Sequence, residues 1–322
     1  MNKEDDNMDI FDNLIKVYKK NNIGLNTMSL GFFSLYLKKL LNSQEKNIIV
    51  VTPTIYEANK IYQNFCDTKD VFLYETDDIL TTNAASRSPE LKVEKLNLLK
   101  ESLTDNKKIV ITDINGYLKK LPSINDFKND ILNIEVKKEI AMEKLINKLY
   151  DNGYEKETIV TKPGEIGVRG FILDIFPLNE ENPVRIEFFG DEVESIRYFD
   201  PETQKSLKNI NEISIYSLEN KNKKEFSSLY DYLNSPLVIF KDYSQIKVSY
   251  ERIINDIFEL NIENPLYDIN EINEKYVNYF FDLDNNTISN IDDNIYFDVH
   301  LLQRFNSNIE LINNYLKEQI KL

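Results

Sequence analysis

Residues 164–200 read GEIGVRGFILDIFPLNEENPVRIEFFGDEVESIRYFD, and this stretch decides how the middle of the chain folds. Aliphatic and aromatic residues recur in it between short turn signals, which predicts a meander of three strands. These strands are Val168–Phe176, Val184–Phe189 and Val193–Phe199. Gly190-Asp191 is a two-residue hairpin signal, because glycine supplies the positive φ of a primed turn. The stretch therefore predicts a small antiparallel sheet, with residues 177–183 as its wider connection.

Alternation along the second strand sorts its side chains between two faces of the sheet. One face carries Val184, Ile186 and Phe188, and the other carries Arg185, Glu187 and Phe189. We expect the first face to be core. An aromatic ring beside an arginine on the solvent side is enriched at interface anchors. The alternative is a solvated face with Phe189 tucked under a neighbouring loop, and single exposed apolar residues are common enough to keep it open.

The first strand raises a problem of alternation. Strict alternation puts four residues on one face: Arg169, Phe171, Leu173 and Ile175. That is an awkward burial for a charge. A β-bulge at Gly170 would reset the alternation and turn Arg169 outward with Arg185. Asp174 is then the candidate buried polar side chain; it either pairs with an arginine or caps a turn, and we expect the ion pair.

The regions on either side alternate helix and strand patterns. Before the quoted stretch, helical spacing alternates with apolar runs: helices at 30–41, 55–65 and 89–103, strands at 47–53, 71–74 and 108–112. After it, helix, strand and helix patterns return at 229–233, 237–240 and 248–260, and a helix closes the chain at 308–322. We interpret 261–294 as short edge strands joined by long loops. The alternation predicts a parallel α/β sheet interrupted by a small α+β insert, which opens with a helix at 139–152.

Composition excludes several kinds of function. The chain has 54 acidic and 39 basic residues in 322, a net charge of -15, which argues against autonomous tight DNA binding. One cysteine, Cys66, and one histidine, His300, exclude an internal disulfide and a Cys/His zinc cluster. The acidic start and the absence of an apolar run of about 18 residues predict a soluble, cytoplasmic protein without a membrane span.

A nucleotide site would need a glycine-rich loop with a lysine after a strand. The candidate is residues 24–31, GLNTMSLG, which Phe32 and Phe33 follow. These bulky residues stand where phosphate oxygens need room, and none of the eight glycines precedes Lys-Ser or Lys-Thr. We interpret the segment as an ordinary loop into a helix. The sequence thus predicts no cofactor, no metal and no enzymatic activity, and no spacing among its carboxylates supports a catalytic pair.

The quoted stretch resembles the insert shared by transcription-repair coupling factors and the excision-repair helicase subunit UvrB. The matching positions are Gly164, Arg169-Gly170, Leu173–Pro177, Pro183–Arg185, Phe188–Glu192 and Phe199-Asp200. Weaker similarity runs through VVTPTIYEA near the start, SRSPE at 86–90 and the approach to the insert at 151–154. UvrB would carry an intact phosphate loop, so its absence favours the coupling-factor arrangement.

That resemblance implies a degenerate RecA-like or helicase-like α/β domain, interrupted by an insert like UvrB domain 2. Its boundaries would be 1–131 for the first part of the α/β domain, 132–218 for the UvrA-interaction insert, and 219–322 for the second part and the start of a linker or next domain. Complete coupling factors add an RNA-polymerase-binding domain and two ATP-driven translocase lobes that act on duplex DNA, and we expect neither in this chain.

For the insert, the resemblance implies binding of the damage sensor UvrA through Lys162–Pro201. The contacting positions of the family, two arginines and an aromatic, fall on Arg169, Arg185 and Phe189. Arginines present charged forks to carboxylates, and a phenylalanine gives an apolar anchor. Replacing Arg185 or Phe189 by alanine is expected to weaken UvrA binding and to leave the fold intact.

Two alternatives stay open. One is a UvrB-related, nucleic-acid-dependent ATPase or helicase fragment with a cryptic nucleotide site, which an ATP titration would test. The other is a free-standing nucleic-acid-binding module, which a gel shift with duplex DNA at modest salt would test. The net charge of -15 predicts no shift.

Overall fold

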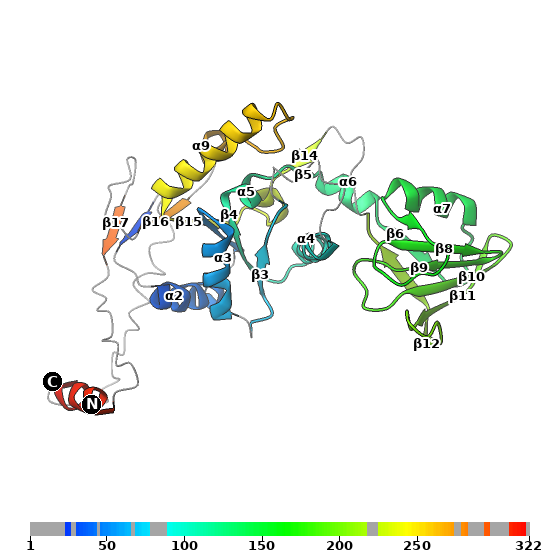
Figure 1. Ribbon diagram of the computed structural model, residues 1–322, viewed down its shortest axis with the longest axis horizontal. Helices are drawn as coiled ribbons and strands as arrows, with labels where there is room; N and C mark the ends of the chain where they lie inside the picture. Colours follow the sequence, from blue (N-terminus) through cyan, green and yellow to red (C-terminus); the bar gives the residue numbers. More distant parts are fainter. Residues whose placement is uncertain are drawn as a thin grey trace, which may run out of the picture.

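The chain forms two regions of different architecture, an α/β region and an α+β insert (Figure 1). The computed structural model describes residues 23–26, 30–43, 46–65, 68–77, 89–217, 225–273, 278–282, 293–296 and 309–319. Within these residues, a seven-stranded parallel sheet organises the α/β region and a six-stranded, mainly antiparallel sheet organises the insert. The predicted α/β class with an α+β insert is confirmed.

The parallel sheet has the strand order β17-β1-β16-β15-β2-β4-β3. Its strands are β1 (Ile23–Asn26), β2 (Ile48–Thr52), β3 (Val71–Tyr74), β4 (Ile109–Asp113), β15 (Leu237–Lys241), β16 (Asn278–Asp282) and β17 (Asp293–Tyr296). All residues of β2 and β15 are buried, as expected for parallel strands covered on both faces. The predicted edge strands of 261–294 are wrong for β16, which lies inside the sheet between β1 and β15.

Helices cover both faces of this sheet. On one face, the core joins α2 (Leu30–Ser43) and α3 (Ile55–Tyr62) to alternate residues of the strands, such as Ile48 and Val50. On the other face, Ile49 and Val51 pack with α4, α5, α8 and α9. These helices span Pro89–Ser102, Ile114–Leu118, Leu229–Tyr232 and Tyr243–Glu259. Two core layers therefore sandwich the sheet. The interpretation of residues 24–31 as a loop is wrong in part, because residues 24–26 belong to strand β1 and residues 30–31 to α2, whose Phe33 is fully buried; residues 27–29 lie outside the described residues.

Shorter elements complete the described chain. They are η2 (Gln63–Phe65), α6 (Ile124–Asn129), α10 (Ile269–Asn273), α11 (Ile309–Gln319), and the paired strands β5 (Leu121–Pro122) with β14 (Phe226–Ser227) and β6 (Leu132–Glu135) with β13 (Glu212–Ile215). In Figure 1, α6 lies between the α/β region and the insert.

The insert packs one helix, α7 (Met142–Asp151), against one face of its sheet. The strand order is β12-β11-β10-β9-β8-β7. The strands are β7 (Glu155–Lys156), β8 (Glu165–Arg169), β9 (Ile172–Ile175), β10 (Val184–Phe189), β11 (Glu192–Phe199) and β12 (Ser206–Ile210). Leu145 and Leu149 of α7 share a core with Val184, Ile186 and Phe188, so the predicted core face of β10 is confirmed. Its other face points away from α7.

The first predicted strand of the meander is wrong in one respect. Residues 168–176 do not form one strand, because the chain reverses between Arg169 and Ile172 to make the hairpin of β8 and β9. Gly170 adopts a φ of +59°, which suits the first position of a tight hairpin turn and costs glycine little. The reversal takes the place of the expected bulge. At the next hairpin, Gly190 has a φ of +64°, and the predicted turn at Gly190-Asp191 is confirmed.

Candidate functional site

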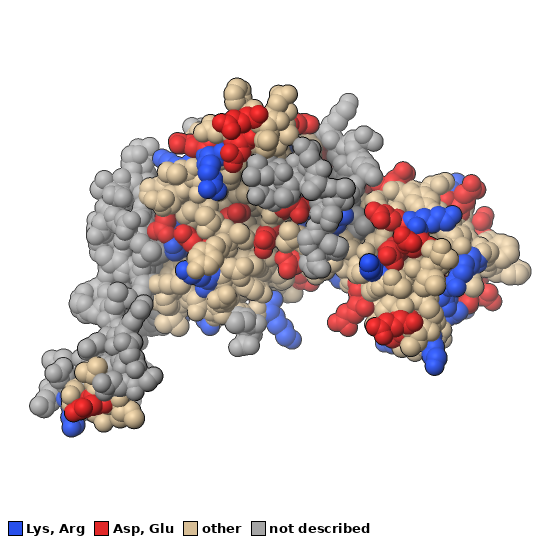
Figure 2. Space-filling model, viewed as in Figure 1, with Lys and Arg blue, Asp and Glu red and all other residues tan. Residues whose placement is uncertain are grey.

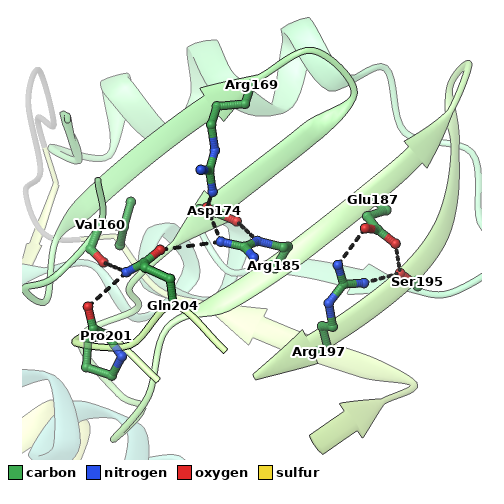
Figure 3. Close-up of polar contacts among 9 residues, drawn as sticks. All are labelled: Val160, Arg169, Asp174, Arg185, Glu187, Ser195, Arg197, Pro201 and Gln204. Atoms are coloured by element: carbon green, nitrogen blue, oxygen red, sulfur yellow. Dashed lines mark hydrogen bonds and ion pairs between the residues drawn. The ribbon is translucent and has the colours of Figure 1, made fainter. Parts of the chain in front are cut away.

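The sheet face of the insert opposite α7, which we call the outer face, carries the three predicted contact residues. Strand β10 is paired with β9 so that Arg185 lies opposite Asp174, and with β11 so that it lies opposite Arg197. Hairpin β8–β9 brings Arg169 to the same carboxylate. Figure 3 shows Arg169 and Arg185 converging on Asp174 from two strands.

Asp174 binds both arginines. Arg185 donates from Nε to Oδ1 at 2.7 Å and from Nη2 to Oδ2 at 2.9 Å, a bidentate pair. Arg169 donates from Nη2 to Oδ2. The carboxylate is only 3% exposed, so the expected ion pair of a buried Asp174 is confirmed, with two partners instead of one.

The two arginines differ in exposure. The side chain of Arg185 is 13% exposed and that of Arg169 is 53% exposed. The guanidinium carbon of Arg185 lies 4.6 Å from the ring centroid of Phe199, a cation–π distance. A partner therefore reaches Arg169 directly, whereas Arg185 is mainly enclosed by its own domain.

Val160, Pro201 and Gln204, which we call the strap, enclose Arg185. Gln204 accepts from Arg185 Nη2 at 3.4 Å and donates to the carbonyl oxygens of Val160 and Pro201 (Figure 3). Val160 lies so close to strand β8 that a Cβ atom on Gly167 would stand 3.2 Å from its Cγ2. Because Gly167 has no Cβ atom, Val160 can pack against β8, and the strap can cover the outer face beside Arg185. Arg185 is held by contacts inside the domain on several sides.

A second ion pair lies further along β10. Arg197 donates to Glu187 Oε1, and Ser195 Oγ donates to Glu187 Oε2 at 2.8 Å. Hydrogen bonds from Arg197 and then Ser195 lower the pKa of Glu187 to about 2. Glu187 is therefore ionised at neutral pH, with Arg197 balancing its charge.

Sequence alternation missed Arg197 and Ser195. Alternation along 193–199 places both on the face of buried Val193. The register of β10 and β11 shifts between Glu187 and Phe188, so that Glu187 lies opposite Ser195 while Phe188 lies opposite Val193. Glu194 is the extra residue of this irregularity, which moves Ser195 and Arg197 to the outer face. Nothing in the sequence marks this position by itself.

Two phenylalanines lie at or next to the turns of the β8–β9 and β10–β11 hairpins, at the end of the sheet away from the strap. Phe189 is 79% exposed, so the alternative in which a loop covers it is wrong. Phe171 is 68% exposed at the turn between β8 and β9. Strand alternation had placed Phe171 on the buried face, because the reversal at Gly170 is not visible in an apolar run. The sequence feature that could have indicated this turn is Gly170, which follows the charged Arg169 and can adopt the positive φ of a hairpin turn.

Two other kinds of site to consider in the described part of the chain are a metal centre and a membrane span. Among the described residues, no group of three or more His, Cys, Asp or Glu side chains is placed to hold a metal ion. None of the described helices has the length and apolarity needed to cross a membrane. The outer face carries charge, hydrogen bonds and exposed aromatic rings, which are common in surfaces that bind another protein.

Comparisons with known proteins assign the region that contains the outer face to a protein family. Residues 132–220 match the family described as the UvrB interaction domain. The transcription-repair-coupling factor of Staphylococcus epidermidis (ATCC 35984) is 31% identical over 275 residues, which is 84% of this chain and 22% of that protein. The protein of the same name from Bacillus subtilis (strain 168) is 32% identical over 185 residues, 56% of this chain and 16% of that protein.

A Staphylococcus aureus relative (strain bovine RF122) with that name is 31% identical over 240 residues, 74% of this chain and 19% of that protein. The chain thus spans about a fifth of the length of the curated relatives it matches. Their similarity reaches well beyond the insert into the α/β region. Residues 132–220 therefore belong to the UvrB interaction domain family, and the chain is related over most of its length to the transcription-repair coupling factors.

Proposed function

We propose that this chain is a non-catalytic module that binds UvrA through the outer face of its insert. In a coupling factor, that contact would recruit UvrA to stalled RNA polymerase during transcription-coupled nucleotide excision repair. The observation that carries the proposal is the exposed ring of Phe189 on the same sheet face as the half-exposed Arg169, within a domain of the UvrB interaction family.

The geometry of the face suits protein docking. Arg169 is held by Asp174, so its guanidinium is already oriented before a partner arrives, and less side-chain entropy is lost on binding. Phe189 extends from a hydrogen-bonded strand and needs no rearrangement to insert its ring. A charged rim beside an exposed aromatic is the usual composition of an interface anchor.

We also propose a separate role for each part of the chain. Residues 132–218 would be the docking unit, and residues 1–131 and 219–322 its α/β support. We assign no ATP site to this chain, and we place contacts with RNA polymerase and duplex DNA in other parts of coupling factors. A module of this kind would act in the cytoplasm.

Replacing Arg169 by alanine is expected to weaken UvrA binding by about 1–2 kcal/mol, as for a lost hydrogen bond to a charged group. The salt dependence of binding should fall as well, because a partly exposed charge is removed from the interface. Calorimetric titration of the purified chain with purified UvrA at two salt concentrations measures both effects.

The matched control is Arg252→Ala, which removes an exposed arginine from α9 in the α/β region. It should bind like the unaltered chain. Equal affinity and equal salt dependence for the unaltered chain, Arg169→Ala and Arg252→Ala would show that Arg169 takes no part. No measurable UvrA binding by the folded, unaltered chain would overturn the proposed function.

A further inference from the structure

We propose that Phe171 is a second aromatic anchor for the same partner, at the end of the sheet where the outer face meets the hairpin tips, so that the partner is bound by two separate rings at neighbouring tips. The proposal rests on the proposed function, because it takes UvrA as the occupant of the face. The residues implied by family resemblance, Arg169, Arg185 and Phe189, do not include Phe171.

The two rings belong to the same end of the sheet. Phe188 donates its backbone N–H to the carbonyl oxygen of Phe171 at 2.9 Å, and Glu187 lies opposite Ile172 in the register of β9 and β10. The backbone of Phe171 therefore lies beside β10, one residue before Phe189. Figure 1 places the β8–β9 and β10–β11 hairpins side by side at the end of the insert farthest from the parallel sheet, and Figure 2 shows uncharged atoms at this end bordered by charged side chains.

The fold itself does not require a phenylalanine at position 171. The turn depends on Gly170, whose φ of +59° suits glycine, whereas the next turn position commonly takes small polar residues. Phe171 is 68% exposed and belongs to none of the hydrophobic clusters of the described residues. Complete burial of an aromatic side chain covers roughly 150–250 Å², and Phe171 still exposes about two thirds of its surface to a partner, with only two side-chain torsions to order.

The charges around the rings indicate the chemistry of the partner surface. Arg169 and Arg185 share the single carboxylate of Asp174, so this cluster has one net positive charge, while Glu187 and Arg197 balance each other. Asp191 and Glu192 next to Phe189 are exposed and acidic, so the positive charge is confined to the Arg169 side of the tips. The exposed member of the cluster is Arg169. The complementary surface on UvrA would be an apolar recess that accepts two rings and has a carboxylate at its edge, opposite Arg169.

Titration of UvrA with Phe171→Ala, Phe189→Ala and the double variant tests this inference. We expect Phe171→Ala to lower the affinity about tenfold, within the range for interface anchors. Its salt dependence should match that of the unaltered chain, in contrast to Arg169→Ala. Its melting curve should change little, because the residue is mostly exposed and belongs to none of the hydrophobic clusters of the described residues. The control is Phe258→Ala, which removes a ring that is 85% exposed on α9 and should leave the affinity unchanged.

The outcomes separate the two proposals. If Phe171→Ala binds within twofold of the unaltered chain while Phe189→Ala binds much more weakly, Phe171 is not an anchor and the proposed function stands. If the unaltered chain does not bind UvrA, the proposed function fails and this inference with it. If Phe258→Ala weakens binding as much as Phe171→Ala, the loss is not specific to the hairpin tips and the inference is overturned.

Discussion

Replacing Arg185 by alanine is expected to lower the free energy of unfolding by about 3 kcal/mol, the low end for removing one member of a buried ion pair. Asp174 is 3% exposed and would lose its bidentate partner, and Arg169 alone cannot satisfy both carboxylate oxygens. The guanidinium contact with the Phe199 ring is lost as well. Urea unfolding followed by circular dichroism measures the change.

Two controls separate the buried charge from the lost contacts. Arg169→Ala removes the more exposed partner of Asp174 and should cost about 1 kcal/mol or less. Asp174→Asn combined with Arg185→Ala should recover part of the loss, because the buried charge is then gone. If Arg185→Ala unfolds within 1 kcal/mol of the unaltered chain, Arg185 does not hold this end of the sheet together.

This expectation revises what the sequence suggests for Arg185. Family resemblance places it among the contact residues, and from the sequence alone its removal should leave the fold intact. The structure encloses the guanidinium, which makes weaker UvrA binding by Arg185→Ala ambiguous between a lost contact and a distorted face. Binding by this variant should be measured well below its melting temperature.

Replacing Phe189 by alanine is expected to weaken UvrA binding by 2 kcal/mol or more, roughly thirtyfold, as for a central aromatic anchor. Stability should stay the same, because the ring is 79% exposed and contributes little to the core. The prediction contrasts with that for Arg185, where stability changes first. Calorimetric titration beside a melting curve distinguishes the two cases.

Phe258→Ala is the control for this variant too, since its ring is even more exposed but lies in the α/β region. Unchanged UvrA affinity for Phe189→Ala, with a normal melting curve, would remove Phe189 from the interface. A lower melting temperature would instead show that the ring supports the hairpin.

The α/β region and the core face of the insert could be predicted from the sequence because burial there follows a simple period. Strands β2 and β15 are apolar except for their last residues, Thr52 and Lys241, and burial alternates along Val184–Phe188 of β10, so Ile186 was assigned to the core correctly. The position of β16 could not be predicted in this way. Which strands become neighbours depends on contacts between segments far apart in the chain.

The outer face was harder to predict, because two local irregularities decide it. Gly170 permits a bulge or a turn equally well, and only the pairing of β8 with β9 shows that it forms a turn. The extra residue at Glu194 then exchanges the faces of Ser195 and Arg197. A period-two pattern loses its phase at each such point, so residues beyond it are assigned to the wrong face.

The exposure of Arg169 and Arg185 could not be predicted from the sequence pattern either. Both match the family in type and spacing, and the outer face does receive both. Val160 and Gln204, which enclose Arg185, come from two connections far apart in the chain, between β7 and β8 and between β11 and β12. Only the assembled fold shows that Arg169 is the accessible one.

Amide hydrogen exchange of the chain, with and without saturating UvrA, tests the central claim most directly. The exposed turns at 170–171 and 190–191 should exchange fast in the free chain and slow down in the complex. Exchange in α9, which carries Arg252 and Phe258, should stay the same. No slowing at the two hairpin tips, or slowing in α9 instead, would contradict docking of UvrA on the outer face of the insert.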